Sequence, residues 1–194
     1  MLPEKYRPSS EEVKKYLQLW DSLENYVLQE DALDKLFFDT YPYNKKIEDI
    51  LIKAASLNDF YSTNIFSIFP VAKHIKRLDI DERLQSGDDT LVNEIALVNM
   101  NGREINFYSF ATKYCSHHKP LEYPIYDTYV EKVLLTLKKR DKFYNFTKQD
   151  MKDFPKFKKI IKEFRKFYKL EEYTLKDIDR YLWQLGKEYY PNKY

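Results

Sequence analysis

Apolar side chains recur every three or four residues through most of the chain, which is the spacing of one face of an α-helix. Between Ser9 and Gln29, capping serines are followed by two glutamates and then by apolar positions at helical intervals. This pattern predicts one long helix. Similar patterns predict further helices over residues 31–37, 47–57, 64–78, 89–98, 107–118, 128–139, 155–167 and 174–186, with a short helical turn over 81–84.

The Asn101-Gly102 pair is a turn signal with two interpretations. In a sheet it would form a β-hairpin, with residues 104–107 as a short strand. Strand signals are scarce elsewhere, and the chain has only 3 glycines in 194 residues, so we expect the pair to link two helices. The sequence therefore predicts an all-α fold, organised as a single helical domain over residues 1–194 with two lobes of roughly 1–85 and 86–194.

Composition indicates a folded protein of an ordinary kind. Apolar residues make up 43% of the chain and charged residues 33%, which is typical of globular domains. A single cysteine, Cys115, excludes an internal disulfide. No apolar run approaches the ~20 residues of a membrane span, and the first seven residues lack the apolar core of a signal peptide. We therefore expect a cytoplasmic protein without a membrane partner.

The net charge of +2 conceals a strong asymmetry. Residues 1–60 hold 8 Lys or Arg against 12 Asp or Glu, whereas residues 131–169 hold 14 against 5. A concentrated basic segment is typical of proteins that bind a polyanion, and it is equally typical of a solvated helix face. The 18 tyrosines also admit two interpretations, a compositional bias or a groove that stacks on bases.

One pair of residues combines useful chemistry with a geometry that two helices can hold. Lys113 lies in the predicted helix 107–118, and Asp127 caps the helix that follows the Pro120–Pro124 loop. An amine attacks electrophilic carbon to give a Schiff base, and a carboxylate stabilises the positive charge that develops. A salt bridge joining two consecutive helices is the structural alternative for the same pair.

Other candidate groups in this region do not predict a site. Cys115, His117 and His118 are too close together on one helix to surround a metal ion, and no second cysteine completes a tetrahedral set. The same crowding argues against a Cys–His nucleophile. His74 lies among apolar positions and is expected to be a structural histidine. No metal and no cofactor are therefore expected.

Two short motifs surround the candidate pair: Ser-Phe-Ala-Thr-Lys, which ends at Lys113, and Pro-Ile-Tyr-Asp-Thr-Tyr-Val, which contains Asp127. Both resemble motifs of the helix-hairpin-helix DNA glycosylase superfamily, especially its 8-oxoguanine glycosylase branch. The stretch 62–64 also resembles that family's Asn-bearing segment. Ser109 and Ala111 stand where the family has glycines, and the interval between lysine and aspartate is shorter than usual. The stretches around residues 58–64 and 110–115 also resemble a set of uncharacterised bacterial proteins.

The resemblance implies a two-lobed helical fold and a base-excision mechanism on double-stranded DNA with a damaged or modified base. A flipped nucleotide would be attacked by Lys113, with Asp127 stabilising the transition state, and the Schiff base could lead to strand scission. The implied substrate pocket contains Tyr61, Asn64, Tyr126 and Tyr129. The side chains expected to contact the DNA backbone are Lys138, Lys139, Arg140, Lys158, Lys162 and Arg165.

Two further hypotheses fit the same residues. The first is a nucleic-acid-binding protein without catalysis, in which DNA binding survives the loss of Lys113. The second is a helical interaction protein, in which Lys113 and Asp127 are structural and the basic segment meets an acidic protein.

Overall fold

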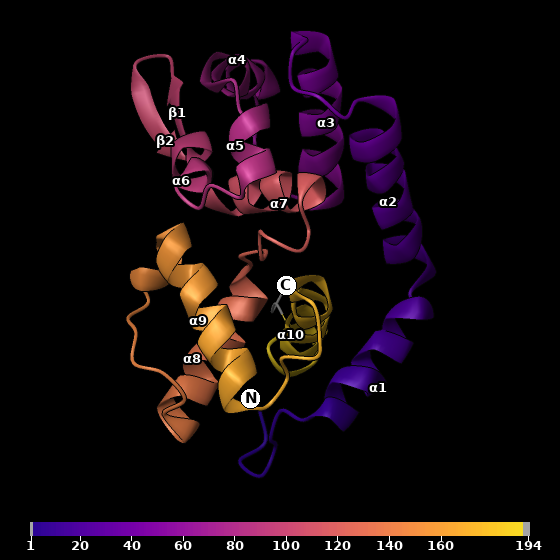
Figure 1. Cartoon of the computed structure of the whole chain (residues 1–194), viewed down its shortest axis with the longest axis vertical. Helices are drawn as coiled ribbons and strands as arrows, with labels where there is room; N and C mark the ends of the chain where they lie inside the picture. The colour runs from indigo at the N-terminus through magenta and orange to yellow at the C-terminus, as the bar shows by residue number, and fades with distance from the viewer. Residues whose placement is uncertain (1, 192–194) are drawn as a thin grey trace. The chain divides into compact units, whose positions relative to one another are not determined.

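The structure is a computed structural model that describes residues 2–191, and helices make up most of it (Figure 1). The predicted all-α class is therefore confirmed. A two-stranded hairpin and two short irregular helices, η1 and η2, accompany the α-helices. In chain order the elements are α1 (Ser10–Asp21), α2 (Glu24–Asp34), the π-helix η1 (Lys35–Thr40), α3 (Ile47–Phe60), α4 (Ile68–Leu78), α5 (Asp81–Ser86), α6 (Leu91–Ala96), β1 (Leu97–Met100), β2 (Arg103–Asn106), α7 (Tyr108–His118), α8 (Thr128–Asp141), the 3₁₀ helix η2 (Asp150–Lys152), α9 (Phe154–Phe167) and α10 (Leu175–Tyr189).

The chain forms two compact units. The first unit combines Met1–Glu24 with Pro124–Tyr194, and the second is the continuous segment Asn25–Tyr123. These bounds differ from the predicted lobes of roughly 1–85 and 86–194, because α1 packs against α10 at the other end of the sequence. That the whole chain makes a single domain stays a prediction.

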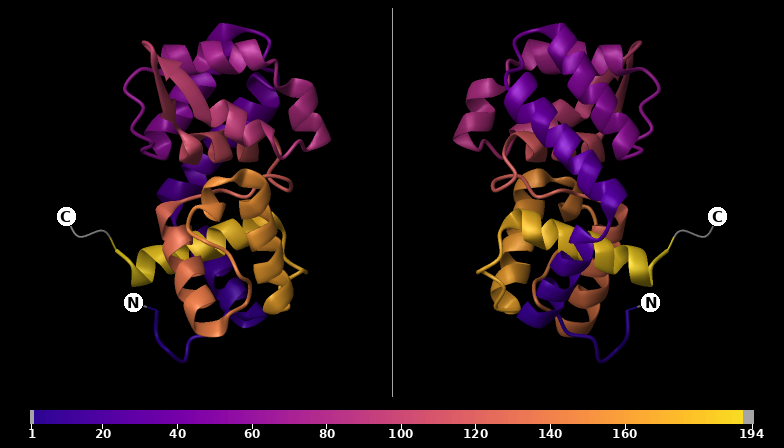
Figure 2. Two further views of the ribbon diagram at one scale, coloured as in Figure 1. Left: turned by 90° about the vertical axis from the view of Figure 1, so that its left-hand side faces the viewer. Right: turned by 90° about the vertical axis from the view of Figure 1, so that its right-hand side faces the viewer.

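The first unit is built around α10, which packs against both α1 and α8 (Figure 2). Thr174 and Asp177 form a capping box at the start of α10, since each side chain accepts a hydrogen bond from the other residue's backbone N–H. Gly186 allows the closest approach of α10 to α8. A Cβ atom at this position would lie 2.5 Å from the Cβ atom of Tyr129 and 2.9 Å from its carbonyl carbon.

The second unit has α7 as its most buried helix. α7 packs against α3, α6 and the π-helix, and nine of its eleven residues are buried. α3 packs in turn against α4. The polar residues of α7 are therefore enclosed by protein, and their contacts decide what the helix can do.

A β-hairpin replaces the helix–turn–helix link that the sequence predicted at Asn101-Gly102, so this prediction was wrong. β1 and β2 are antiparallel, and Met100 pairs with Arg103, which leaves Asn101 and Gly102 as a two-residue turn. Both turn residues have positive φ, 54° and 85°, as a type I′ turn requires. Asn99 strengthens the turn by accepting a hydrogen bond from the Gly102 N–H over 2.8 Å. This local chemistry outweighed the scarcity of strands elsewhere.

The long helix predicted from Ser9 to Gln29 is also wrong, because it is two helices. α1 ends at Asp21, and Ser22 closes it by donating both its N–H and its hydroxyl to the carbonyl of Leu19. A serine that bonds to the preceding turn competes with helix continuation. The helix predicted over residues 31–37 does not begin at Asp31, which lies inside α2.

Candidate functional site

Lys113 lies in the middle of α7, and only 2% of its surface is exposed. Its Nζ atom donates a hydrogen bond to Oγ of Ser109, one helical turn earlier, over 2.7 Å. The ring of Tyr61, at the end of α3, has its centroid 5.3 Å from the same Nζ, within the range of a cation–π contact. The second unit therefore holds the Lys113 amine in a fixed position beside an aromatic ring.

A chain of polar contacts continues from Tyr61. Its hydroxyl is hydrogen-bonded to Nε2 of His117 over 3.0 Å, and Nδ1 of His117 lies 3.7 Å from a carboxylate oxygen of Asp34. Lys113 and His117 are four residues apart, so they lie on the same face of α7. We call Ser109, Lys113, Tyr61, His117 and Asp34 the Lys113 cluster.

Sequence reasoning found part of the Lys113 cluster. It selected Lys113 and Tyr61, which the structure brings together, and it missed His117 and Asp34. The four-residue interval from Lys113 to His117 was an available signal, because a helix places such residues together. Asp34 belongs to α2, and nothing local in its sequence indicates this partner.

Asp127 is the N-cap residue of α8, as predicted. Its carboxylate accepts a hydrogen bond from the N–H of Tyr129 over 2.8 Å. Lys113 belongs to the second unit and Asp127 to the first. Joint action of the two residues on one substrate stays a prediction.

Asn64, a predicted pocket residue, is exposed in the loop between α3 and α4. Its φ of 59° is left-handed, so α4 does not begin at Asn64 as predicted but at Ile68. Asn58 organises this loop, since its side-chain oxygen accepts hydrogen bonds from the Thr63 hydroxyl over 2.7 Å and the Ile65 N–H over 3.0 Å. The loop is therefore held by hydrogen bonds to Asn58, and Asn64 is exposed to solvent.

The other two predicted pocket residues, Tyr126 and Tyr129, lie in the first unit. Tyr126 is buried, its hydroxyl donates to the carboxylate of Glu131, and Nζ of Lys152 lies 3.9 Å from its ring centroid. Tyr129 is half-buried beside Gly186. That Tyr126 and Tyr129 line a pocket together with residues of the second unit stays a prediction.

Of the residues predicted to contact the DNA backbone, some are exposed, one is buried, and the others already bond to neighbouring protein groups. Lys139 and Lys162 are exposed, whereas Lys158 is buried on the core side of α9. Arg140 forms a two-point ion pair with Asp141, at 2.7 and 2.6 Å. The two remaining side chains donate to backbone carbonyls: Lys138 to Phe146 and Arg165 to Glu171.

The exposed face of α9 carries the positive charge that the sequence predicted. Lys159, Lys162 and Lys166 are exposed and recur at three- and four-residue intervals, so they form one stripe along the helix. We call these three residues the α9 stripe. It is a better candidate for phosphate contacts than Lys158, because its amines reach solvent.

A second buried amine, Lys53 on α3, was missed by sequence reasoning. Its Nζ donates to the side-chain oxygen of Asn44 over 2.8 Å and to the carbonyl of Tyr43 over 3.1 Å, and lies 3.3 Å from Nε2 of His118. Burial lowers the pKa of Lys53 to about 8. Burial and the neighbouring Lys53 charge hold the pKa of His118 well below its ordinary value, so His118 is neutral.

Asn44 is the centre of this network. Its side-chain oxygen also accepts from the Tyr114 hydroxyl over 2.6 Å, and its amide donates to Asp81 over 2.7 Å. We call Asn44, Lys53, Tyr114, His118 and Asp81 the Asn44 network. The network joins α3, α5 and α7 to the loop that precedes α3, and its hydrogen bonds give Lys53 a structural role.

The lowered pKa of Lys53 gives the protein a specific pH dependence. Between pH 8 and 10.5 the unfolded chain carries a proton on Lys53 that the folded protein has lost, so the contribution of Lys53 to the free energy of unfolding increases with pH in this window. Groups with a raised pKa, such as the Cys115 thiol, act in the opposite direction, but they are present in both the wild-type protein and Lys53→Met. We therefore expect the free energy of unfolding of the wild-type protein to rise by about 2 kcal/mol relative to that of Lys53→Met between pH 7.5 and 9.5, as measured by urea unfolding. An equal change with pH in both proteins would contradict the assignment.

Cys115 does not supply a reactive thiolate to the Lys113 cluster or to the Asn44 network. It is fully buried, and burial raises the pKa of its thiol, so the reactive thiolate is disfavoured. In residues 2–191 no group of three or more His, Cys, Asp or Glu side chains is arranged to hold a metal ion. No helix in this range is long and apolar enough to cross a membrane.

Comparisons with known proteins identify relatives of this chain. The HI_0787_N family, described as an N-terminal domain, matches residues 12–122. A protein of Haemophilus influenzae, described as an "Uncharacterized protein", is 51% identical over 146 residues, which cover 75% of this chain and 70% of the relative. No solved structure matches the chain. The segment that the family model matches, residues 12–122, includes the Lys113 cluster and the Asn44 network.

Proposed function

We propose that this chain, which belongs to the HI_0787_N family, is a DNA glycosylase-like protein whose nucleophile is Lys113. The observation that carries the proposal is the setting of the Lys113 amine. It is enclosed by protein, hydrogen-bonded to Ser109 and placed beside the Tyr61 ring. An amine that attacks a sugar carbon needs this kind of fixed position and restricted access to water.

In the proposed reaction Lys113 attacks the anomeric carbon of a flipped nucleotide, and the bond between that carbon and the base breaks. Asp127 stabilises the positive charge that develops on the sugar, and the base leaves with the bonding electron pair and takes up the proton that the attacking Lys113 amine loses. The amine–sugar adduct opens to a Schiff base, from which strand scission can follow. His117 has a positioning role, since it holds the Tyr61 hydroxyl.

The charge distribution supports DNA as the partner. The α9 stripe offers three exposed amines along one helix face. Cations that neutralise phosphates release counterions, so binding should weaken steeply as salt is added. Lys139, at the end of α8, adds a further exposed cation in the same unit.

Borohydride trapping tests the nucleophile directly. We expect a covalent protein–DNA adduct with at least one duplex carrying 8-oxoguanine, uracil, a hydroxymethylated base or an abasic site, because reduction fixes a Schiff base. Lys113→Ala should abolish the adduct. The matched control is Lys76→Ala, an exposed lysine on α4, which should leave the adduct yield unchanged.

A second variant separates the charge of Asp127 from its role at the helix end. Asn caps helices as well as Asp does, so Asp127→Asn should keep α8 intact while removing the carboxylate. Base excision should then fall by about 100-fold or more, as expected when one electrostatic group of a transition state is lost. An adduct that persists in Lys113→Ala, or unchanged excision in Asp127→Asn, would refute the assigned roles.

A binding protein without catalysis is the second candidate, and a specific observation favours it. Ser109 holds Lys113 within α7, and Asp127 caps α8, so each residue also has a structural task. This candidate predicts DNA binding at about 50 mM salt that survives Lys113→Ala and is weakened when the α9 stripe is changed to alanine. Failure to bind any duplex would exclude both candidates.

A further inference from the structure

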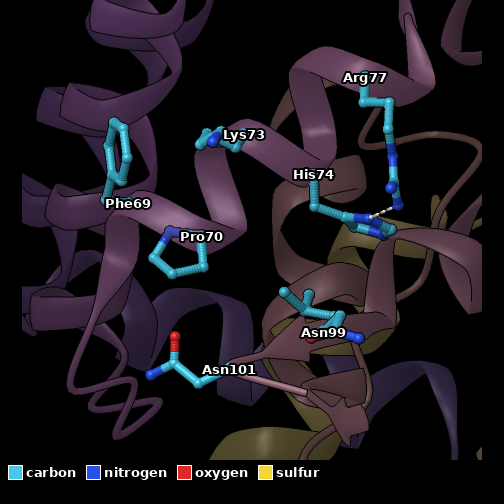
Figure 3. Close-up of a pocket in the computed structure, with 8 residues that line it drawn as sticks. Phe69, Pro70, Lys73, His74, Arg77, Asn99 and Asn101 are labelled. Atoms are coloured by element: carbon cyan, nitrogen blue, oxygen red, sulfur yellow. Dashed lines mark hydrogen bonds between the residues drawn. The ribbon is translucent and has the colours of Figure 1, made fainter. Parts of the chain in front are cut away.

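A cleft lies in the second unit between the face of α4 and the β-hairpin (Figure 3). Its volume is about 470 Å³, within the range of roughly 300 to 1,000 Å³ that small-molecule sites occupy. It contains none of the residues of the Lys113 cluster or the Asn44 network. Whatever binds here is therefore independent of the chemistry proposed for Lys113.

The α4 side of the cleft is positively charged. Lys73 and Arg77 line it one helical turn apart, and both are exposed. Among residues 2–191 neither of them has a carboxylate within 4.0 Å, unlike Arg83, which is paired with Asp88 and Glu94. Two uncompensated cations in one hollow attract an anion.

Buried His74 holds one of these cations in place. Nη2 of Arg77 lies 3.0 Å from Nδ1 of His74, while Nε2 of His74 is hydrogen-bonded to the backbone carbonyl of Glu94 over 2.8 Å. The histidine thus connects α4 to α6, as expected of a structural residue, and its contact with Arg77 can be followed in Figure 3. The guanidinium is pre-positioned, which lowers the entropy that a ligand must overcome.

The remaining walls of the cleft are suited to a planar, polar ring. Phe69 is 54% exposed, and Nζ of Lys73 lies over its ring, 5.6 Å from the centroid, so the ring can stack on a base only where Lys73 does not cover it. Asn99 and Asn101 project from the hairpin side. The Asn99 oxygen accepts a hydrogen bond from the Gly102 N–H, which fixes this side chain and leaves its amide N–H₂ group as a donor.

We propose that this cleft binds a nucleotide. Its phosphate would lie between Lys73 and Arg77, its base would stack on Phe69, and the hairpin amides would meet the base edge. Each part of this ligand matches one feature of the cleft: positive charge, a partly exposed aromatic ring and neutral hydrogen-bonding groups. A simple anion would use only the first feature. The inference goes beyond the proposed function, since it uses neither Lys113 nor Asp127.

Isothermal titration with the four nucleoside 5′-monophosphates tests the inference, with inorganic phosphate and the free nucleosides as partial ligands. We expect a monophosphate to bind at least tenfold more tightly than either partial ligand. Lys73→Ala and Phe69→Ala should each weaken binding by about tenfold, for loss of a charged contact and of base stacking. Lys76→Ala removes an equivalent exposed cation from the same helix outside the cleft and should change binding less than twofold.

A short single-stranded oligonucleotide, labelled with fluorescein, distinguishes the two sources of this ligand. Binding that is much tighter than that of the monophosphates, and equally sensitive to Lys73→Ala, would indicate a nucleotide within a strand. Binding of the monophosphates alone would indicate a free nucleotide.

Three results would overturn the inference. The first is an affinity for inorganic phosphate equal to that for the monophosphates. The second is unchanged binding in both Lys73→Ala and Phe69→Ala. The third is no binding by the wild-type protein at millimolar ligand. Both altered side chains are exposed, so the variants should remain folded, and circular dichroism checks this.

Discussion

Asn44→Ala is expected to lower the free energy of unfolding by about 3 to 5 kcal/mol, the cost of breaking a buried network that contains a charge. The Asn44 side chain is only 1% exposed and accepts hydrogen bonds from both Lys53 and Tyr114. Alanine removes this acceptor and leaves the amine of Lys53 and the hydroxyl of Tyr114 buried with fewer partners. Each unsatisfied group costs about 1 to 3 kcal/mol, and a charged group costs more.

Urea unfolding followed by circular dichroism measures this effect. Asn25→Ala is the matched control, because Asn25 is an exposed asparagine in the same unit and its side chain accepts a hydrogen bond from Gln29 on the helix surface. It should cost less than about 0.5 kcal/mol. A loss below about 1 kcal/mol in Asn44→Ala would show that water or a rearranged Lys53 replaces the missing acceptor.

Gly186→Ala should also destabilise the protein, by about 2 to 3 kcal/mol, although alanine is the better helix former. The added Cβ atom would lie 2.9 Å from both the carbonyl carbon and the oxygen of Tyr129. These are backbone atoms, so no change of side-chain rotamer relieves the overlap. α10 must move away from α8, and the packing between the two helices is lost along their contact.

Thermal and urea unfolding of Gly186→Ala and Lys187→Ala provide the comparison. Both variants place an alanine at neighbouring positions of α10, but Lys187→Ala removes a half-buried side chain that contacts the Trp183 ring and adds no atom against α8. We expect a cost below about 1 kcal/mol for Lys187→Ala. If Gly186→Ala were as stable as the wild-type protein, the close approach of α10 to α8 would be incorrect.

The sequence predicted the helices of the C-terminal half well because their ends are marked by local chemistry. Asp127 caps α8, Pro155 lies in the first turn of α9, and Thr174 with Asp177 forms a capping box. Each signal acts within four residues, so no tertiary information is needed.

The errors arose where one local signal had to be weighed against the rest of the chain. The periodic apolar pattern of residues 10–29 continues through the break at Ser22, whose hydrogen bonds to Leu19 end the helix. At Asn101-Gly102 the turn signal indicates a hairpin, but the scarcity of strand signals elsewhere led us to expect a link between two helices.

The candidate site was predictable only in part, for a physical reason. Lys113 and His117 share a helix face, so their proximity follows from the sequence. Asn44, by contrast, bonds to residues 9, 37 and 70 positions away. Each of these residues is ordinary by itself, and only the folded chain brings them together.

The insertion of one unit into the other has a consequence for synthesis on the ribosome. Asn25–Tyr123 is a continuous segment, so all of its contacts are available while the rest of the chain is still being made. The carbonyl of Tyr16 in α1, however, receives its hydrogen bond from Gln184, which is 168 residues later. The face of α1 that packs against α10 therefore stays without its partner until α10 has left the ribosome. The segment Asn25–Tyr123 can thus fold first, and folding of the first unit is completed only after synthesis of α10.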